Sequence, residues 1–582
     1  MIPTSGALTM SVLREAYARG AKPADMVHAV YRRIEEINDP AIFIHLRAVD
    51  DVIADAENLP RQTDEMPLWG MPFVAKDNID VAGIPTTAAC PAYAYTPDKD
   101  AFVITQLRNA GALLIGKTNL DQFATGLVGV RSPYGVPKNA VDPDIVPGGS
   151  SSGSGVAVGH GFATFSLGTD TAGSGRVPAA LNNIVGLKPS LGALSATGLV
   201  PACRTLDTIS IFAGTVSDAY AVFEVACAFD PKDAFSKPIT AGALAAQEDI
   251  TIGVPNNATR IFFGDDAQAA SFDRSLDHLK SLGATIVELD FTPFYEVAKM
   301  LYEGAWVAER YTVVQDLMAN QQNALHPTTE KIISAAKDLS AADAFNGIYR
   351  LKALERTAQQ VLADVDMLCV PTIPTYYSVG DLEADPVTPN SNLGTYTNFV
   401  NLLDMCGIAV PSELRRDGRP GSITLLAKSG KDALVASVAS AFAGEVLPTM
   451  PAPIKETEIA LAVCGAHMSG MGLNHELTSR GARLLRATTT SPNYKLYALA
   501  GGPPQRPGML RTTDGAAIEL EVWALPKTEA GAFLAGIPAP LSIGTVHLAD
   551  GTAAHGFLVE AAGIAGAQDI THLGSWRNFQ TP

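Results

Sequence analysis

The sequence lacks the patterns that would place this chain in a membrane or on a nucleic acid. No run of about 18 uncharged apolar residues is present, so we expect no membrane span. The N-terminus has no basic segment followed by an apolar one, so no signal peptide is expected. The formal net charge is −18, which argues against a polyanionic partner such as nucleic acid. It leaves room for a small anionic ligand, because one or two local arginines can bind one.

Cysteine is scarce, and it is not arranged for disulfide bonds or metal binding. The six cysteines form no CxxC pair and the ten histidines form no HxxxH pair, so no metal site is predicted. This usage is typical of buried thiols in a reducing compartment, and we therefore expect a cytoplasmic protein.

What is present is enough apolar sequence for a large ordered core. Of 582 residues, 47% are apolar and 18% are charged, which favours two or three packing units. Residues 9–37 have the spacing of two amphipathic helices, interrupted around Gly20 and Pro23. Farther on, short apolar runs alternate with turns and helical stretches, which is typical of an α/β sheet covered by helices. Examples of these runs are 72–75, 112–115, 250–254 and 367–371.

A domain boundary is predicted at 447–456, where three prolines favour a semi-rigid linker. Residues 1–446 would form the first domain. Residues 457–582 begin again with strand-like runs, and we predict a separate, smaller α+β or β-rich domain there.

The most informative segment begins at the Gly/Ser cluster 148–155. Alone, such a cluster is most often a loop. Its neighbourhood, however, contains apolar stretches that a flexible linker does not have. Ser174 follows within GTDTAGSGR, and Lys76 precedes within GMPFVAKDNIDVAG. Between Lys76 and the cluster lies NLDQFATGLVGVRSPYG, residues 119–135.

In these motifs the chain resembles the amidase signature family, most closely over about residues 65–210 and more weakly over the rest of 1–445. The resemblance implies a mixed central sheet covered by helices. It also implies that Ser174 is the nucleophile, that Ser150, preceded by a cis peptide bond, is a relay, and that Lys76 is the base. Ser152 departs from the pattern, because many members have glycine there.

The chemistry of these residue types agrees with that assignment. A serine hydroxyl is a weak nucleophile until a base withdraws its proton. Lysine can be that base only when neutral, so its pKa must be lowered by burial or by nearby cations. Lys76 follows the apolar run 72–75, which predicts a position at the end of a buried strand. The simpler alternative to a catalytic base is a solvated lysine beside Asp77.

The tetrahedral intermediate of amide hydrolysis needs hydrogen-bond donors for its oxyanion. The loop Thr171, Ala172, Gly173 and Ser174 is predicted to present its backbone N–H groups for this purpose. Asp170 and Arg176 flank the loop, and we expect them to hold it rather than to react.

Within the family, segment 119–135 and the added C-terminal domain resemble the allophanate hydrolases, which implies a small anionic amide as substrate. By this resemblance Tyr302 and Arg310 bind the substrate carboxylate. The two residues are about two helical turns apart and are expected near one face of one helix. Gly126 is expected to line the same pocket. Without the resemblance, a packing tyrosine and an exposed arginine would be the simpler interpretation.

The implied reaction is hydrolysis of allophanate to ammonia and carbon dioxide via N-carboxycarbamate, without a metal or organic cofactor. The chain has no biotinyl-lysine motif and no region large enough for an ATP-grasp domain, so a urea carboxylase would be a separate polypeptide. We also expect a homodimer.

The C-terminal region 457–582 resembles the extra domain of allophanate hydrolases, a fold similar to γ-glutamyl cyclotransferases. Its segment 463–482 carries His467 and His475, either of which could transfer a proton near neutral pH during decarboxylation. Alternatively, both histidines only satisfy local hydrogen bonds and the domain packs or dimerises.

Three other functions stay open. The protein could hydrolyse another small amide, or be the amidase component of a tRNA-dependent amidotransferase. The charge of −18 and the C-terminal domain fit the second poorly. A catalytically silent scaffold with an amidase fold is the third.

Overall fold

The computed structural model describes residues 2–3, 5–247, 250–446, 454, 457–501 and 505–580. The chain divides into two compact units, Met1–Pro448 and Thr449–Pro582, which are described separately below. The predicted proline-rich linker, 447–456, lies outside the described residues apart from Ile454.

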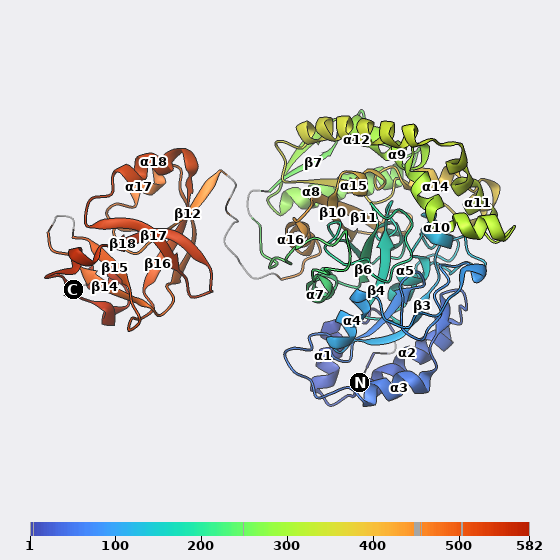
Figure 1. The fold of residues 1–582 in the computed structure, drawn as a ribbon, viewed down its shortest axis with the longest axis horizontal. Coiled ribbons are helices and arrows are strands. Elements are labelled where there is room, and N and C mark those ends of the chain that lie inside the picture. The colour runs from blue at the N-terminus through green and yellow to red at the C-terminus, as the bar shows by residue number, and fades with distance from the viewer. Residues whose placement is uncertain are drawn as a thin grey trace. The chain divides into compact units, whose positions relative to one another are not determined.

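An eleven-stranded mixed sheet forms the centre of the first unit (Figure 1). Its strand order is β1-β3-β2-β4-β6-β5-β10-β11-β9-β7-β8. Strand β2 is parallel to both neighbours, as is β7, whereas the other pairs are antiparallel. The predicted mixed α/β sheet is thus confirmed. The strands are β1 (Phe43–Leu46), β2 (Pro72–Lys76), β3 (Leu113–Thr118), β4 (Phe165–Asp170), β5 (Val185–Lys188), β6 (Thr208–Ala213), β7 (Thr251–Pro255), β8 (Thr285–Leu289), β9 (Met367–Pro371), β10 (Met405–Ser412) and β11 (Gly421–Lys428).

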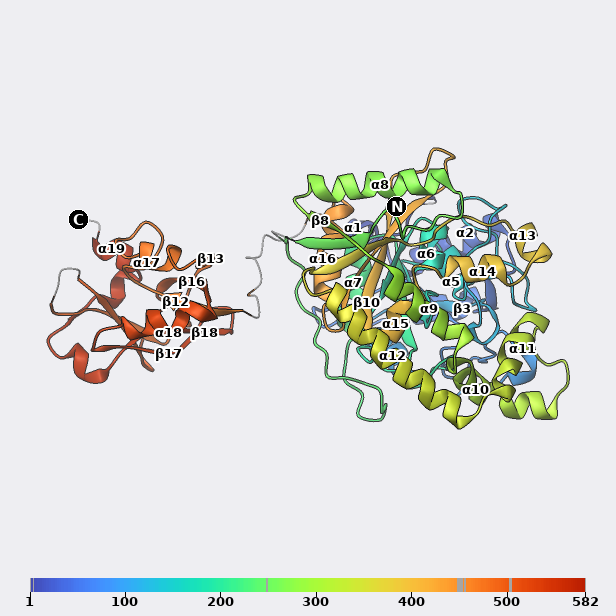
Figure 2. The ribbon, with the colours of Figure 1, turned by 90° about the horizontal axis from the view of Figure 1, so that it is seen from above.

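Helices lie on both sides of this sheet (Figures 1 and 2). The two helices predicted in 9–37 are present as α1 (Met10–Ala18) and α2 (Pro23–Ile37). The chain turns between them at Gly20, whose positive φ suits glycine, and Pro23 opens α2 because the first helical turn needs no proline N–H. The other helices are α3 (Val49–Glu57), α4 (Phe102–Asn109), α5 (Ser152–Gly159), α6 (Val177–Leu181), α7 (Val216–Ala226), α8 (Asp266–Ser281), α9 (Thr292–Glu303), α10 (Trp306–Asn320), α11 (Pro327–Ser334), α12 (Ala341–Val361), α13 (Val379–Ala384), α14 (Thr388–Leu393), α15 (Phe399–Leu402) and α16 (Asp432–Phe442).

The core of this unit is built from strands that are buried on both faces. Every residue of β2, β3, β4 and β9 is buried. Such strands read as continuous apolar runs rather than as alternating patterns, which is why the runs 72–75 and 367–371 were recognisable. Polar side chains within these strands therefore lie in the interior and need internal partners.

The second unit is an α+β structure with its own core, as predicted. A five-stranded sheet has the order β13-β16-β12-β18-β17, and a three-stranded sheet has the order β15-β14-β19. The proposed likeness to γ-glutamyl cyclotransferases stays a prediction. Its elements are β12 (Glu458–Val463), α17 (His475–Thr478), β13 (Arg483–Thr489), β14 (Tyr494–Ala498), β15 (Pro507–Arg511), β16 (Glu519–Pro526), α18 (Lys527–Ala535), β17 (Leu541–His547), β18 (Ala553–Val559), β19 (Gln568–Asp569) and α19 (Trp576–Gln580).

Across the described ranges, none of the helices has the length and apolar character needed to cross a membrane.

Candidate active site

Lys76 is the last residue of β2, between β3 and β4 in the sheet, and its side chain is fully buried. The prediction of a lysine at the end of a buried strand is confirmed. The Nζ atom lies 2.7 Å from Ser150 Oγ, 2.7 Å from Thr169 Oγ1 and 3.0 Å from Ser151 Oγ. A protonated amine donates all three of these hydrogen bonds, whereas a neutral amine donates two and accepts one. The three hydroxyls therefore suit either protonation state of Lys76.

Burial lowers the pKa of Lys76 to about 7, because the charged amine loses its hydration in the protein interior. The carboxylates of Asp121, Asp207 and Asp170 oppose this shift, and the guanidinium of Arg310 adds to it. A large fraction of Lys76 is thus neutral near pH 7, which is the state that a base requires.

Ser150 lies two residues before the start of α5, and the Gly149–Ser150 peptide bond is cis, as the family resemblance implies. The backbone N–H of Asp121 donates a 3.0 Å hydrogen bond to the Ser150 carbonyl. Ser152, the departure noted in the sequence, donates to the Asn119 carbonyl. Its hydroxyl is therefore engaged with the backbone rather than with Lys76.

Ser174 lies in the loop between β4 and α6, and it is buried. Its hydroxyl donates a long hydrogen bond, 3.5 Å, to the carbonyl of Gly126. Within the described residues, no hydrogen bond joins the hydroxyls of Ser174 and Ser150. The structure thus brings Ser150 and Lys76 into contact and leaves the hydroxyl of Ser174 only weakly engaged.

The loop that precedes Ser174 is fixed from two sides. Asp170 accepts hydrogen bonds from the backbone N–H of Gly173, at 2.9 Å, and forms a buried ion pair with Arg176 at 2.9 Å. Thr397 donates to the Ala172 carbonyl at 2.7 Å. Gly173 has φ +126°, and a Cβ there would lie 2.4 Å from Thr397 Oγ1, so only glycine fits without a shift. Asp170 and Arg176 hold the loop, as predicted.

The four predicted oxyanion donors differ in their availability. The N–H of Gly173 is already bonded to Asp170. For Thr171, Ala172 and Ser174, no partner of the backbone N–H is present in the described part of the chain. These three amides are therefore the donors that remain for an oxyanion.

Asp170 keeps its charge despite complete burial. Burial by itself raises the pKa of this carboxyl group, but the Arg176 guanidinium overrides that effect and lowers the pKa below its usual value. A stable negative charge on Asp170 is needed to hold Gly173 and Arg176 together.

Tyr302 and Arg310 correct one prediction and support another. They do not share one helix: α9 ends at Glu303 and α10 begins at Trp306. Gly304 interrupts the helix with an extended backbone, and a Cβ there would lie 2.5 Å from the Met300 carbonyl oxygen. The two side chains nevertheless meet, because the Arg310 guanidinium carbon lies 5.3 Å from the centre of the Tyr302 ring.

Arg310 is buried, and its hydrogen-bonding capacity is only partly used. Its Nη1 donates weakly to the Ala124 carbonyl at 3.4 Å and to Thr125 Oγ1 at 3.3 Å. Its Nε and Nη2 atoms and the hydroxyl of Tyr302 are buried, and none of them has a hydrogen-bond partner among the described residues. Buried polar groups are rarely left unpaired, so these atoms indicate a site for a ligand with oxygen acceptors. Gly126, the third predicted pocket residue, follows Thr125 directly and bonds to Ser174.

Several residues around Lys76 were not singled out in the sequence. Ser151 and Thr169 contact the amine directly, and Thr397 holds the loop before Ser174. Ser151 could have been found within the serine cluster. Thr397 has no local signal, because it meets the loop only through the tertiary fold.

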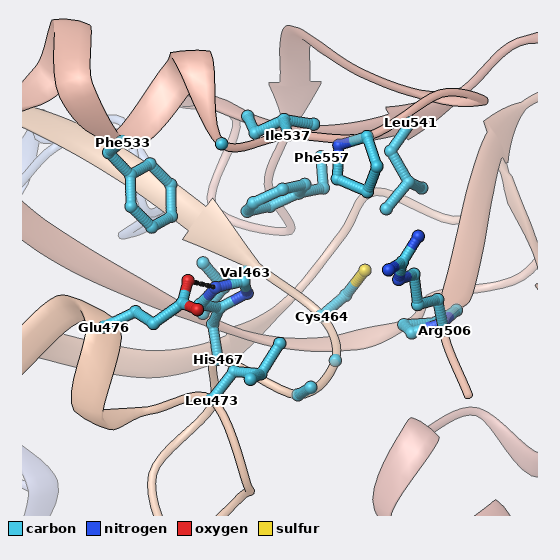
Figure 3. Close-up of a pocket in the computed structure, with 15 residues that line it drawn as sticks. Val463, Cys464, His467, Leu473, Glu476, Arg506, Phe533, Ile537, Leu541 and Phe557 are labelled. Carbon is cyan, nitrogen blue, oxygen red and sulfur yellow. Dashed lines mark hydrogen bonds and ion pairs between the residues drawn. The ribbon is translucent and has the colours of Figure 1, made fainter. Parts of the chain in front are cut away.

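The C-terminal unit contains a cavity of about 330 Å³ that carries His467 (Figure 3). His467 Nε2 lies 3.1 Å from a carboxylate oxygen of Glu476, and the ring stacks on Phe557 with centres 5.3 Å apart. Burial lowers the pKa of His467, and Glu476 opposes that shift. Arg506 lies on the other side of the cavity from Glu476 (Figure 3).

His475 differs from His467 in its environment. Its side chain is exposed, its Nδ1 contacts the Gly472 carbonyl, and it does not line the cavity. No group of three or more His, Cys, Asp or Glu side chains placed to hold a metal ion is found in the described ranges.

Similarity to known proteins extends over both units. The amidase family model matches residues 25–436, and the allophanate hydrolase C-terminal domain model matches residues 459–581. Urea amidolyase of Saccharomyces cerevisiae is 43% identical over 89% of this chain, which spans only 30% of that relative. One component of the glutamyl-tRNA(Gln) amidotransferase of Nitratidesulfovibrio vulgaris is 34% identical, over 77% of this chain and 98% of the relative.

Among solved structures, Kluyveromyces lactis allophanate hydrolase matches with a TM-score of 0.79 and 40% identity, over 99% of each chain. The K. lactis urea amidolyase structure matches with a TM-score of 0.80, and this chain covers 37% of it. The chain therefore belongs to the amidase family and carries an allophanate hydrolase C-terminal domain.

Proposed function

We propose that this protein hydrolyses allophanate, with Ser174 as nucleophile, Ser150 as relay and Lys76 as base. The observation that carries the proposal is the buried pair Tyr302 and Arg310, whose unpaired polar atoms suit a carboxylate. The Arg310 guanidinium is close enough to Lys76 to affect the pKa of that amine. The similarity to an allophanate hydrolase over nearly the whole chain supports the same substrate.

In the proposed first step, neutral Lys76 takes the proton of Ser150, and Ser150 takes the proton of Ser174. The Ser174 oxygen attacks the ureido carbonyl carbon, and the carbonyl oxygen becomes an oxyanion. The free amides of Thr171, Ala172 and Ser174 are the proposed donors, and removing one such donor typically costs about 3–4 kcal/mol of transition-state stabilisation.

In the second step the intermediate collapses, and its C–N bond breaks. The leaving nitrogen takes the proton that Lys76 had received, returned through Ser150, and departs as ammonia. Water then attacks the acyl-enzyme by the same proton route, which releases N-carboxycarbamate and restores the Ser174 hydroxyl. None of these proposed steps requires a cofactor.

The substrate carboxylate fits Arg310 because a guanidinium offers parallel N–H donors. Two of its nitrogen atoms, Nε and Nη2, have no hydrogen-bond partner in the part of the chain that the structure describes, and the Tyr302 hydroxyl can add a third hydrogen bond.

A comparison of substrates tests this proposal. Ammonia release from allophanate is compared with release from biuret, malonamide and acetamide at equal concentrations. We expect allophanate to have the highest kcat/KM, since only its carboxylate pairs with Arg310. A higher kcat/KM for a neutral amide would replace this substrate with another small amide. Glutamine-dependent amidation of a charged tRNA would instead indicate the amidotransferase component.

For the C-terminal unit, the His467 cavity favours a second function, a proton transfer during decarboxylation of N-carboxycarbamate. When the N–CO₂ bond breaks, its electron pair stays on nitrogen, which must then gain a proton. His467, hydrogen-bonded to Glu476, can relay that proton, and Arg506 can attract the anion. His475 was a candidate for the same role, but its exposed position gives it no contact with the cavity. The alternative is a packing or dimerisation domain.

We further propose a homodimer in the cytoplasm that works with a separate urea carboxylase. The six cysteines are free thiols, which suits a reducing compartment. The similarity to proteins named urea amidolyase supports a functional link to urea breakdown. Sedimentation equilibrium tests the dimer, and a coupled assay with urea, ATP, bicarbonate and a urea carboxylase tests the link.

A further inference from the structure

Asp121 is a fully buried carboxylate that the reaction scheme above does not use. No lysine or arginine in the described ranges forms an ion pair with it. Instead, backbone amides satisfy it: Oδ1 accepts from Arg131 N at 2.9 Å, and Oδ2 accepts from Gly129 N at 2.9 Å and Val128 N at 3.3 Å. Its hydrogen bonds come from backbone amides, and its charge interacts with the guanidinium of Arg131 and the amine of Lys76. Burying a carboxylate costs free energy, so we infer that its position and charge serve a purpose.

The loop that Asp121 holds reaches both parts of the proposed site. Its Gly126 carbonyl accepts the hydroxyl of Ser174, and its Ala124 and Thr125 contact Arg310. The backbone N–H of Asp121 itself bonds to the Ser150 carbonyl at 3.0 Å. Asp121 and the loop that it holds therefore connect the relay Ser150, the nucleophile Ser174 and the carboxylate-binding Arg310.

Two glycines pack directly on the Asp121 carboxylate. A Cβ added to Gly126 would lie 2.5 Å from Asp121 Oδ2, and one added to Gly149 would lie 2.0 Å from the same atom. Real Cβ atoms do not approach so closely, so any side chain at either position would displace the carboxylate. The position of Asp121 is thus tied sterically to the residue before Ser150.

Asp121 also acts on Lys76 through its charge. The charged groups that affect this amine are the carboxylates Asp121, Asp207 and Asp170 and the guanidinium of Arg310. Asp121 is the strongest of the three carboxylates, and Asp170 is already paired with Arg176. Asp207 accepts hydrogen bonds from Thr171 and from the amides of residues 202 and 203. All three carboxylates favour the protonated amine.

We propose that Asp121 is a positioning residue for amide hydrolysis, which fixes the loop 124–131 against Ser174 and Arg310 and whose charge stabilises Lys76 once that residue has taken its proton. The inference rests on the proposed roles of Ser174, Ser150 and Lys76. In this view, Asp121 couples substrate binding to proton transfer, although it is none of those three residues.

The test is Asp121→Asn in the full-length protein, read out by the rate at which a fluorophosphonate labels Ser174 between pH 5 and pH 9. This probe needs the activated serine but not allophanate. Without the charge, protonated Lys76 is less stable, so we expect the acid limb of the profile to move down by about one pH unit. Lys76 also becomes a weaker base, so the plateau rate should fall by about tenfold.

A second measurement concerns substrate binding. If the loop is fixed by Asp121, then Asp121→Asn should also raise KM for allophanate, because Ala124 and Thr125 no longer hold Arg310. The exposed Asp144 provides the matched control. Asp144→Asn makes the same change in net charge and should move neither the acid limb nor KM.

Suppose that the probe labels the wild-type protein and that the Asp121→Asn variant folds. An acid limb at the same pH in both proteins would then overturn the inference and leave the proposed function intact. Wild-type protein that is not labelled at Ser174 would overturn the proposed function, and the inference with it. If Asp121→Asn does not fold, Gly126→Ala decides, because it displaces the carboxylate but keeps the charge. Slower labelling supports the inference, and labelling at the wild-type rate contradicts it.

Discussion

The two units of this chain place polar groups in different ways. In the amidase unit, Lys76, Ser150 and Ser174 are buried, and the carboxylates around them are held by amides or by an arginine. In the C-terminal unit, His467 lines a cavity of about 330 Å³ and has one polar side-chain partner, Glu476. A serine nucleophile requires a preorganised and water-poor environment, whereas one proton transfer does not. The contrast agrees with the proposal that the amidase unit performs the hydrolysis.

The largest effect is expected from Ser174→Ala, which would test whether the amidase unit performs the hydrolysis. Without the nucleophilic oxygen, ammonia release from allophanate should fall by about 10⁴-fold or more. Ser152→Ala is the matched control. Among the described residues, its buried hydroxyl hydrogen-bonds only to the Asn119 carbonyl, so the rate of this variant should stay within a few fold of wild type. Turnover that survived Ser174→Ala would favour a catalytically silent amidase unit and would place the hydrolysis elsewhere in the chain.

The next largest effect concerns Tyr302 and Arg310, the proposed binding residues for the substrate carboxylate. Arg310→Ala should raise KM for allophanate by about 100-fold, since a lost charge-assisted hydrogen bond costs about 3 kcal/mol. KM for a neutral amide such as acetamide should change much less. Arg204→Ala, at an exposed arginine, is the control and should alter neither value. An unchanged KM for allophanate would refute the carboxylate role of Arg310.

The pH dependence of the first unit follows from Lys76, whose pKa is lowered to about 7. Below that pH the amine is protonated and cannot accept a proton from Ser150. The rate constant kcat/KM should therefore fall by about tenfold for each pH unit below 7 and level off above it. Steady-state assays from pH 5 to pH 9 measure this directly. A rate that was flat down to pH 5 would exclude Lys76 as the base.

The smallest effect is expected in the C-terminal unit. N-carboxycarbamate can lose carbon dioxide without help, so His467→Asn should slow carbon dioxide release by only a few fold. Ammonia from the first hydrolysis should be slowed less than carbon dioxide. His475→Asn, at the exposed histidine, is the matched control. Equal slowing of both products by His467→Asn would instead favour a packing role for the domain.

Much of the fold was predictable because its signals are local. The helices of residues 10–37 and the strands β2 and β9 follow from apolar spacing, and Gly20 and Pro23 mark the break between the helices. The helix expected through Tyr302 and Arg310 was wrong. Spacing alone did not reveal that Gly304 has no room for a side chain and interrupts the helix.

The geometry of the candidate site was predictable where motif and chemistry agreed. Lys76, Ser150 and Ser174 occur in recognisable segments, and the end of a buried strand could be inferred for Lys76 from its apolar neighbours. Thr397 could not be found in this way, because it holds the Ser174 loop from a distant part of the chain. The same is true of the difference between His467 and His475, which depends on which ring faces the cavity.

By itself, the sequence determined the family, the mixed α/β sheet, the smaller second domain and the residue types that the chemistry requires. Only the tertiary structure decided that Lys76 is buried deeply enough to lower its pKa to about 7, and that Tyr302 and Arg310 meet although they lie on separate helices. The reason is physical. Periodicity and motifs report on neighbours along the chain, whereas desolvation, charge and unpaired hydrogen bonds depend on every group that surrounds an atom in space.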